Sequence, residues 1–201
     1  MLDTRVRPWL NPMLNGLGKR LAALGISANA LTALGLLVGL CAAAAITLAQ
    51  FKLAFALIVI NRLLDGLDGA VARASAITDR GGYFDIVADY VFYAAVPLAF
   101  GMVDPINNAL PAATLLGSFC LTASSFMAFA AIAARRGLET EAHGKKSFFY
   151  STGLVEGTET VVFFLLMAAL PQWFAELAWV FSALCALTVV QRSALAIRVF
   201  K

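Results

Sequence analysis

The sequence predicts an all-α membrane protein in which six transmembrane helices follow an N-terminal amphipathic helix. Of the 201 residues, 61% are hydrophobic and only 13% are charged, whereas a soluble domain carries charge on roughly a quarter of its residues. The hydrophobic residues gather in runs long enough to cross a bilayer. The net charge is only +3, and no basic helix is interleaved with aromatic residues, so we expect a lipid bilayer and no nucleic acid as partner.

The N-terminal segment, residues 1–27, has the pattern of an interfacial helix. Its apolar residues recur at helical spacing, at Leu10, Met13, Leu14, Leu17, Leu21 and Leu24. Asn11, Asn15 and Lys19 share another side. With arginines nearby, this pattern predicts an amphipathic helix that lies on an anionic membrane surface. The alternative is a water-facing lead-in to the first span.

Six later stretches have the length of a membrane span, which is about twenty residues. They cover residues 29–49, 52–73, 82–102, 109–134, 154–170 and 173–197. Polar or turn-forming residues separate neighbouring stretches, such as Gln50 after the first and Pro171 before the last. We therefore expect residues 28–201 to form a six-helix bundle, and residues 1–201 to form a single domain.

The distribution of basic residues predicts the orientation, because lysine and arginine favour the cytoplasmic side of a membrane. With the N-terminus inside, that side receives Arg5, Arg7, Lys19, Arg20, Arg73, Arg80, Arg135, Arg136, Lys145, Lys146, Arg198 and Lys201. Only Lys52 falls on the outer side. We expect an integral protein of a bacterial inner membrane, with both termini and the active site on the cytoplasmic side.

Four aspartates interrupt the apolar background where the second span ends and the third begins: Asp65, Asp68, Asp85 and Asp89. A carboxylate at the bilayer centre costs about 2.5–3.5 kcal/mol on insertion scales, so such a cluster needs compensating cations. The i,i+3 and i,i+4 spacings put each pair on one face of its helix. A short loop makes the two helices antiparallel neighbours, so the carboxylates should meet. All-oxygen ligands are what Mg²⁺ and Mn²⁺ prefer.

Two simpler explanations compete with a metal site. A single Asp-x-x-Asp pair near a helix end is commonly a solvated turn, with Arg62 paired to Asp65, and Arg73 paired to Asp68 or a lipid phosphate. Acids inside a membrane also mark the ion paths of cation transporters. A transporter predicts carboxylates spread over the bilayer depth, whereas these gather at one end beside Gly69 and Arg73. The clustering favours a reaction at the membrane surface.

The acidic region also carries an ordered motif. It reads Asp65-x-x-Asp68-Gly69-x-x-Ala72-Arg73, then Gly81-x-x-x-Asp85-x-x-x-Asp89. This motif resembles the signature of the CDP-alcohol phosphotransferases, which join a substituted phosphate from a CDP-activated donor to an alcohol. Seven residues separate Arg73 from Gly81, fewer than is usual in the family. The segment Ser27–Thr32 is similar to another family segment, with Ala28 in place of its proline.

The resemblance implies a role for each position. Two divalent cations, Mg²⁺ or Mn²⁺, would be bound by Asp65, Asp68, Asp85 and Asp89. Asp89 would stand by the second metal and accept the proton of the acceptor hydroxyl. The CDP group would be held by Gly69, Arg73 and Thr78, with Asn29 and Thr32 nearby. The acceptor hydroxyl would attack the phosphorus directly, and CMP would leave.

The substrates are less closely determined. We expect CDP-diacylglycerol as the donor because the site lies at the leaflet surface, with a non-lipid CDP-alcohol as the alternative. Glycerol 3-phosphate is the first expectation for the acceptor, and inositol phosphate or another small alcohol follows. A phosphorylated acceptor would contact the basic loop through Lys146 and Arg135, although positive-inside topology explains the same charges. The resemblance also implies a homodimer.

Overall fold

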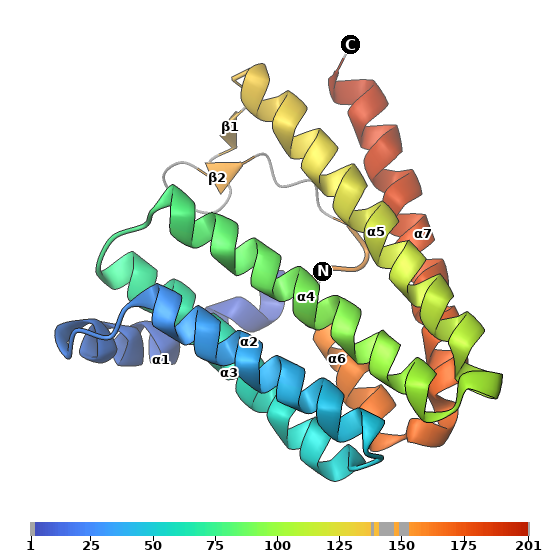
Figure 1. Cartoon of the computed structure of the whole chain (residues 1–201). Coiled ribbons are helices and arrows are strands. Elements are labelled where there is room, and N and C mark those ends of the chain that lie inside the picture. The colour runs from blue at the N-terminus through green and yellow to red at the C-terminus, as the bar shows by residue number, and fades with distance from the viewer. Residues whose placement is uncertain (1–2, 138, 141–146, 149–152, 201) are drawn as a thin grey trace.

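The computed structural model describes residues 3–137, 139–140, 147–148 and 153–200. Seven α-helices make up nearly all of this described part (Figure 1). They are α1 (Asp3–Ala23), α2 (Ala28–Thr47), α3 (Phe51–Ala74), α4 (Asp79–Val103), α5 (Pro105–Arg135), α6 (Gly157–Ala169) and α7 (Phe174–Val199).

The remaining elements are short. A 3-10 turn (Pro171–Trp173) leads into α7. Two strands of two residues each, β1 (Glu139–Thr140) and β2 (Ser147–Phe148), pair antiparallel. Apart from this strand pair, the regular secondary structure of the described residues is helical, as the sequence predicts.

Side-chain caps fix where α2 and α4, the helices beside the acids, begin. At the start of α2, the hydroxyl of Ser27 accepts a hydrogen bond of 3.2 Å from the backbone N–H of Ala30. At the start of α4, the hydroxyl of Thr78 accepts one of 3.1 Å from Gly81. Both caps satisfy amide groups that a helix N-terminus leaves unpaired. Short connections of residues 48–50 and 75–78 join α2 to α3 and α3 to α4, so that α3 runs back along α2, and α4 back along α3 (Figure 1).

Within the described residues, four helical stretches are long and apolar enough to cross a membrane. They are Ala28–Thr47, Asp79–Val103, Pro105–Arg135 and Pro171–Val199. The expected span at 52–73 corresponds to α3, which has 24 residues but also contains three basic and two acidic side chains. The predicted count of six transmembrane helices is therefore not confirmed.

Helix α6 is shorter than the span predicted at 154–170. It has 13 residues, which at about 1.5 Å each cover about 20 Å of a hydrocarbon layer about 30 Å thick. Its start is fixed by a capping box in which Glu156 and Glu159 pair with each other's backbone N–H groups. It ends just before Pro171, because proline disfavours a helical conformation in the residue that precedes it.

Helix α2 holds the acid-bearing helices in place. It packs against both α3 and α4, while α1 lies on α3, α6 on α3, α5 on α4 and α7 on α5 (Figure 1). Direct backbone contact between α3 and α4 is sparse, which differs from the expected packing of these two helices against each other. Since both helices rest on α2, a space for side chains lies between them.

The apolar core lies mainly on the side of the bundle away from the first two aspartates. Its largest fully buried side chains include Phe92, Phe100, Phe164, Phe174, Phe181, Ile46, Ile58, Leu115, Met167 and Val96. They come from the second half of α2, the first half of α3, the later part of α4, and α5 to α7. Close packing there fixes the helix directions, whereas Thr32 and Asp68 are buried near the opposite end.

Candidate active site

The end of α3 and the start of α4 bring three of the four aspartates together. One carboxylate oxygen from each of Asp65, Asp68 and Asp85 lies within 4.8 Å of the others. Oxygen ligands about 2.0–2.1 Å from one Mg²⁺ lie at most about 4.2 Å apart, so small side-chain movements let these acids share a cation. The three carboxylates therefore fit a hard divalent cation.

The fourth aspartate has a different neighbour. Oδ1 of Asp89 accepts a hydrogen bond of 2.9 Å from Nη1 of Arg62. The same nitrogen lies 3.7 Å from Oδ2 of Asp65. The pairing of Arg62 with Asp65 considered from the sequence is thus present, but Asp89 is the closer partner.

Helix α2 orients the most buried acid. The hydroxyl of Thr32 donates a hydrogen bond of 2.6 Å to Oδ2 of Asp68. Thr32 is 6% exposed and Asp68 is 4% exposed, so water does not compete strongly for this contact. One expected donor-binding residue therefore also fixes the orientation of one expected metal ligand.

A cavity of about 570 Å³ opens beside these acids, between the starts of α2 and α4 and the end of α3. Its lining includes every residue expected to hold the CDP group, namely Asn29, Thr32, Gly69, Arg73 and Thr78. Asp68 and Asp85 also line it. Its volume lies in the range of about 300–1,000 Å³ that is usual for small-molecule sites. We call this space the donor cavity.

Two glycines lie close to polar side-chain atoms of the donor cavity. A Cβ at Gly69 would lie 3.3 Å from Nη1 of Arg73. A Cβ at Gly81 would lie 3.0 Å from the hydroxyl of Thr78 and 3.2 Å from Oδ1 of Asn29. A larger residue at either position would require these side-chain atoms to shift slightly.

Arg73 is supported from α1. Its Nη2 donates a hydrogen bond of 3.0 Å to Oδ1 of Asn15. A guanidinium has five N–H donors in a planar fork, so the contact to Asn15 orients the group and leaves further donors for a phosphate. Asn15, which the sequence placed on the polar side of the N-terminal helix, is therefore part of the site's support.

A second cavity of about 460 Å³ lies on the other side of Asp85 and Asp89. We call it the inner cavity, and its polar lining comprises Asp85, Asp89, Tyr90, Tyr93, Thr122, Glu156, Thr160 and Arg192. Arg192 is only 7% exposed. Its Nη1 donates to the carbonyl oxygen of Thr122 at 2.9 Å and to the hydroxyl of Ser125 at 2.7 Å. A buried cation thus stands in the same cavity as the expected proton acceptor.

Of the two residues expected to bind the acceptor, the structure tests only Arg135, and Arg135 lines neither cavity. It is exposed in the last turn of α5, and Lys146 lies outside the described residues. Arg62 and Arg192 were not among the candidates from the sequence. Both arginines could have been found from the sequence, because each lies within an apolar run. Charged residues in such runs face protein interiors or water-filled cavities.

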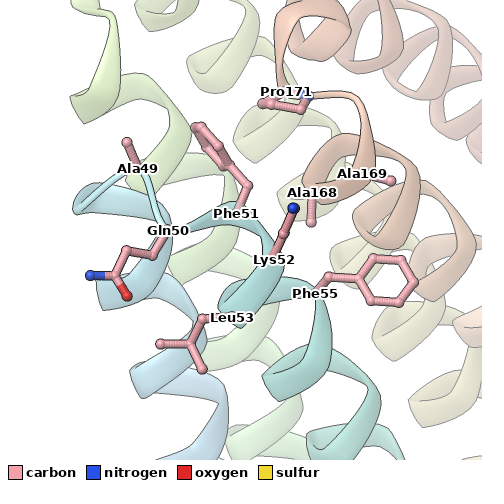
Figure 2. Close-up of a pocket in the computed structure, with 9 residues that line it drawn as sticks. All are labelled: Ala49, Gln50, Phe51, Lys52, Leu53, Phe55, Ala168, Ala169 and Pro171. Carbon is pink, nitrogen blue, oxygen red and sulfur yellow. The ribbon is translucent and has the colours of Figure 1, made fainter.

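A larger cavity, of about 760 Å³, lies far from the acids. It is found where the turn before α3 faces the end of α6 (Figure 2). Its lining is apolar apart from Gln50 and Lys52, and no carboxylate is among the residues that line it. Without acids to hold a cation, its size does not make it the active site.

Comparison with known proteins relates the chain to one family. The sequence profile described as CDP-alcohol phosphatidyltransferase matches residues 25–191. The inner membrane protein YnjF of Escherichia coli (strain K12) is 44% identical over 192 residues, which cover 96% of this chain and 93% of that protein. The archaetidylinositol phosphate synthase of Pyrococcus horikoshii is 32% identical over 122 residues, which cover 60% of this chain and 65% of that enzyme.

Two crystal structures of the Mycobacterium tuberculosis phosphatidylinositol phosphate synthase PgsA1 share the fold. The structure with CDP-DAG bound has a TM-score of 0.70, with 20% identity, and covers 91% of this chain and 92% of that one. The complex with manganese and citrate has a TM-score of 0.69, with 20% identity, and covers 90% and 87%. At this identity the similarity concerns the fold alone.

Proposed function

This chain belongs to the CDP-alcohol phosphatidyltransferase family, and we propose that it transfers a phosphatidyl group from CDP-diacylglycerol to a phosphorylated small alcohol, with release of CMP. The observation that carries this proposal is the donor cavity, in which all five expected CDP-binding residues share one lining with Asp68 and Asp85. CDP-DAG is bound in a solved protein of the same fold, which supports a lipidic donor over a non-lipid one.

The metal site is the first part of the proposal. Asp65, Asp68 and Asp85 would hold a divalent cation, with Asp89 beside a second one. Two such cations, Mg²⁺ or Mn²⁺, supply neutralisation of the pyrophosphate and polarisation of the reacting phosphorus when bound. The fit of three carboxylate oxygens within 4.8 Å and the manganese in a protein of the same fold support this assignment.

The donor is held by the chain's own polar groups. Arg73 would bind a phosphate through guanidinium donors directed away from Asn15. Thr78 and Asn29, at the starts of α4 and α2, would contact the nucleotide, and Thr32 would keep Asp68 aligned. Gly69 would let the phosphates approach the helix backbone closely.

Asp89 is the proposed proton acceptor. It lines the inner cavity, where the acceptor alcohol would lie, and its carboxylate is held by Arg62. The acceptor hydroxyl forms a new bond to the phosphorus that bears the diacylglycerol, its proton passes to Asp89, and the bond to the CMP oxygen breaks. A base within hydrogen-bond reach of the hydroxyl is what this step requires.

The acceptor phosphate would be bound by Arg192. Its buried guanidinium lines the inner cavity together with Asp89, and an arginine in such a place suits a phosphate. Lys146 and Arg135 stay candidates for contacts with the acceptor as it enters the inner cavity. One relative is named an archaetidylinositol phosphate synthase, and one protein of the same fold is a phosphatidylinositol phosphate synthase. These names favour inositol phosphate over glycerol 3-phosphate as the acceptor.

The placement in the membrane is also part of the proposal. Residues 1–201 form one domain with six crossings, where α3 crosses with its charged end at the surface and α6 makes a shortened crossing. Both termini and the site face the cytoplasm, α1 lies in the interface, and two copies form a homodimer. The basic residues that gather on one side by sequence support this orientation.

The test is CMP release by detergent-purified protein supplied with CDP-diacylglycerol, Mn²⁺ or Mg²⁺, and a panel of alcohols that includes inositol phosphate and glycerol 3-phosphate. We expect metal-dependent CMP formation with a phosphorylated acceptor, abolished in Asp68→Ala. If no alcohol in the panel leads to CMP release although the donor still binds, the protein uses another acceptor or donor. If there is neither CMP release nor donor binding, the proposal is contradicted.

A further inference from the structure

A guanidinium lies among the acids, in the region where a divalent cation would have to bind. Nη1 of Arg62 donates to Oδ1 of Asp89 at 2.9 Å and lies 3.7 Å from Oδ2 of Asp65. The side chains of Asp89 and Asp65 are 28% and 35% exposed, so both remain open to a ligand. One protein cation therefore already stands against two of the four carboxylates.

Neighbours on three helices hold Arg62 in one orientation. Its Nε donates to Oδ1 of Asn61 at 2.7 Å, and the amide of Asn61 donates to the carbonyl oxygen of Gly35 in α2 at 2.8 Å. The guanidinium also lies over the fully buried ring of Phe92 in α4, 4.7 Å from its centroid. The side chain is only 14% exposed. These contacts orient the guanidinium toward Asp89.

We infer that Arg62 is a positioning residue with two effects: it fixes the carboxylate of Asp89 toward the inner cavity, and its charge limits how tightly Asp65 and its neighbours bind a divalent cation. The first effect rests on the proposed function, since it concerns the proton acceptor. The second concerns cation binding alone. Because a guanidinium stays charged at any pH a protein tolerates, both effects are permanent features of the site.

The two effects have opposite signs when the charge is removed. A positive charge beside the carboxylates repels an incoming cation, so its loss raises cation affinity by roughly three- to tenfold. Loss of the hydrogen bond lets the carboxylate of Asp89 rotate, and a misplaced catalytic group lowers turnover by roughly 10- to 100-fold. An arginine with only a structural role would weaken both properties on removal.

The experiment compares Mn²⁺ affinity with turnover in Arg62→Met, which removes the charge but keeps an unbranched side chain against Phe92. The purified full chain is titrated with Mn²⁺ alone, and kcat is measured by CMP release at saturating donor and acceptor. We expect tighter Mn²⁺ binding, a lower kcat and an unchanged KM for the donor. Weaker Mn²⁺ binding together with a lower kcat, or no change in either, overturns the inference.

Two further variants complete the test. Arg62→Lys keeps the charge without the planar fork, so Mn²⁺ affinity should stay within about twofold of wild type while kcat falls. If Arg62→Met does not fold, Arg62→Lys still tests the charge effect. A large loss of Mn²⁺ affinity in Arg62→Lys would contradict that effect. Arg80→Met removes an exposed charge at the start of α4, outside both cavities, and should change neither quantity. If the wild type released no CMP, the proposed function would fail, whereas the Mn²⁺ affinities would still test the charge effect.

Discussion

Gly18 of α1 lies directly against Ala70 of α3. A Cβ at position 18 would be 2.7 Å from the Cβ of Ala70 and 2.8 Å from its backbone carbon, and Gly18 is buried. The absence of a side chain thus lets α1 approach the helix that carries Asp65 and Asp68. This approach also brings Asn15 to Arg73, so the contact between the two helices is connected to the donor cavity.

Gly18→Ala should therefore separate α1 from α3. Overpacking against backbone costs about 1–3 kcal/mol, and loss of the Asn15 contact should raise the KM for the donor. Thermal unfolding in detergent and CMP release measure the two effects. Gly16→Ala is the matched control, because a Cβ there meets nothing within 4 Å. A Gly18→Ala protein as stable and active as the control would show that α1 does not dock as described.

Thr32→Val should destabilise the protein most when no divalent cation is present. Without the Thr32 hydroxyl, the buried carboxylate of Asp68 loses a hydrogen bond, at a cost of about 1–3 kcal/mol. Saturating Mn²⁺ should reduce this deficit because the cation satisfies the same oxygen. Unfolding is compared in EDTA and in Mn²⁺. The control is Thr47→Val, which removes only a hydroxyl bonded to the Ala43 carbonyl of the same helix, and its stability should show no such metal dependence. If Mn²⁺ leaves the loss of stability in Thr32→Val unchanged, Asp68 is not a metal ligand.

Asp89→Asn should abolish transfer while leaving metal-dependent donor binding largely intact. An asparagine keeps the shape but cannot accept the proton, and loss of a general base lowers kcat by about 10²–10⁴-fold. CMP release and binding of CDP-diacylglycerol are measured on the same preparations. Asp79→Asn, at the exposed start of α4, should behave as wild type. Loss of donor binding in a folded Asp89→Asn protein would instead make Asp89 an essential metal ligand.

Arg192→Met should raise the KM for a phosphorylated acceptor without changing the KM for the donor. Removing charge-assisted hydrogen bonds of about 1.5–3 kcal/mol corresponds to roughly 10- to 100-fold in KM. Arg198→Met, at an exposed position in the last turn of the same helix, is the control. An unchanged acceptor KM would remove Arg192 from the proposed site. The same assay tests Lys146→Ala, which should raise the KM for a phosphorylated acceptor if Lys146 binds it. An unchanged acceptor KM would mean that the basic residues of this loop reflect only the orientation of the protein in the membrane.

Prediction from sequence was most complete where the evidence is local in the chain. The four aspartates lie between positions 65 and 89, on two helices joined by a short connection, so helical periodicity alone gives the face of each acid. The family assignment also came from this segment, and it is confirmed by the profile match over residues 25–191. The predicted roles of the site residues stay predictions.

Prediction was least complete where distant segments meet. Arg135 and Lys146 were chosen as acceptor contacts because their loop is basic, yet Arg135 lies outside both cavities. Arg192, the buried arginine that lines the inner cavity together with Asp89, comes from α7. The length of α6 was overestimated because hydropathy does not register the capping box of Glu156 and Glu159, which starts the helix at Gly157. The apolar run is longer than the helix that it forms.

The sequence by itself determined that this protein is a helical membrane protein with an acidic motif of the CDP-alcohol phosphotransferase type, because composition, periodicity and motif spacing are properties of neighbouring residues. The tertiary structure alone decided which partner each acid has. Asp68 is held by Thr32 of α2, and Asp89 by Arg62 across the space between α3 and α4. These pairings depend on the packing of α2 against both α3 and α4, because that packing sets the distance between the two helices. The spacing of residues along the chain does not encode this distance.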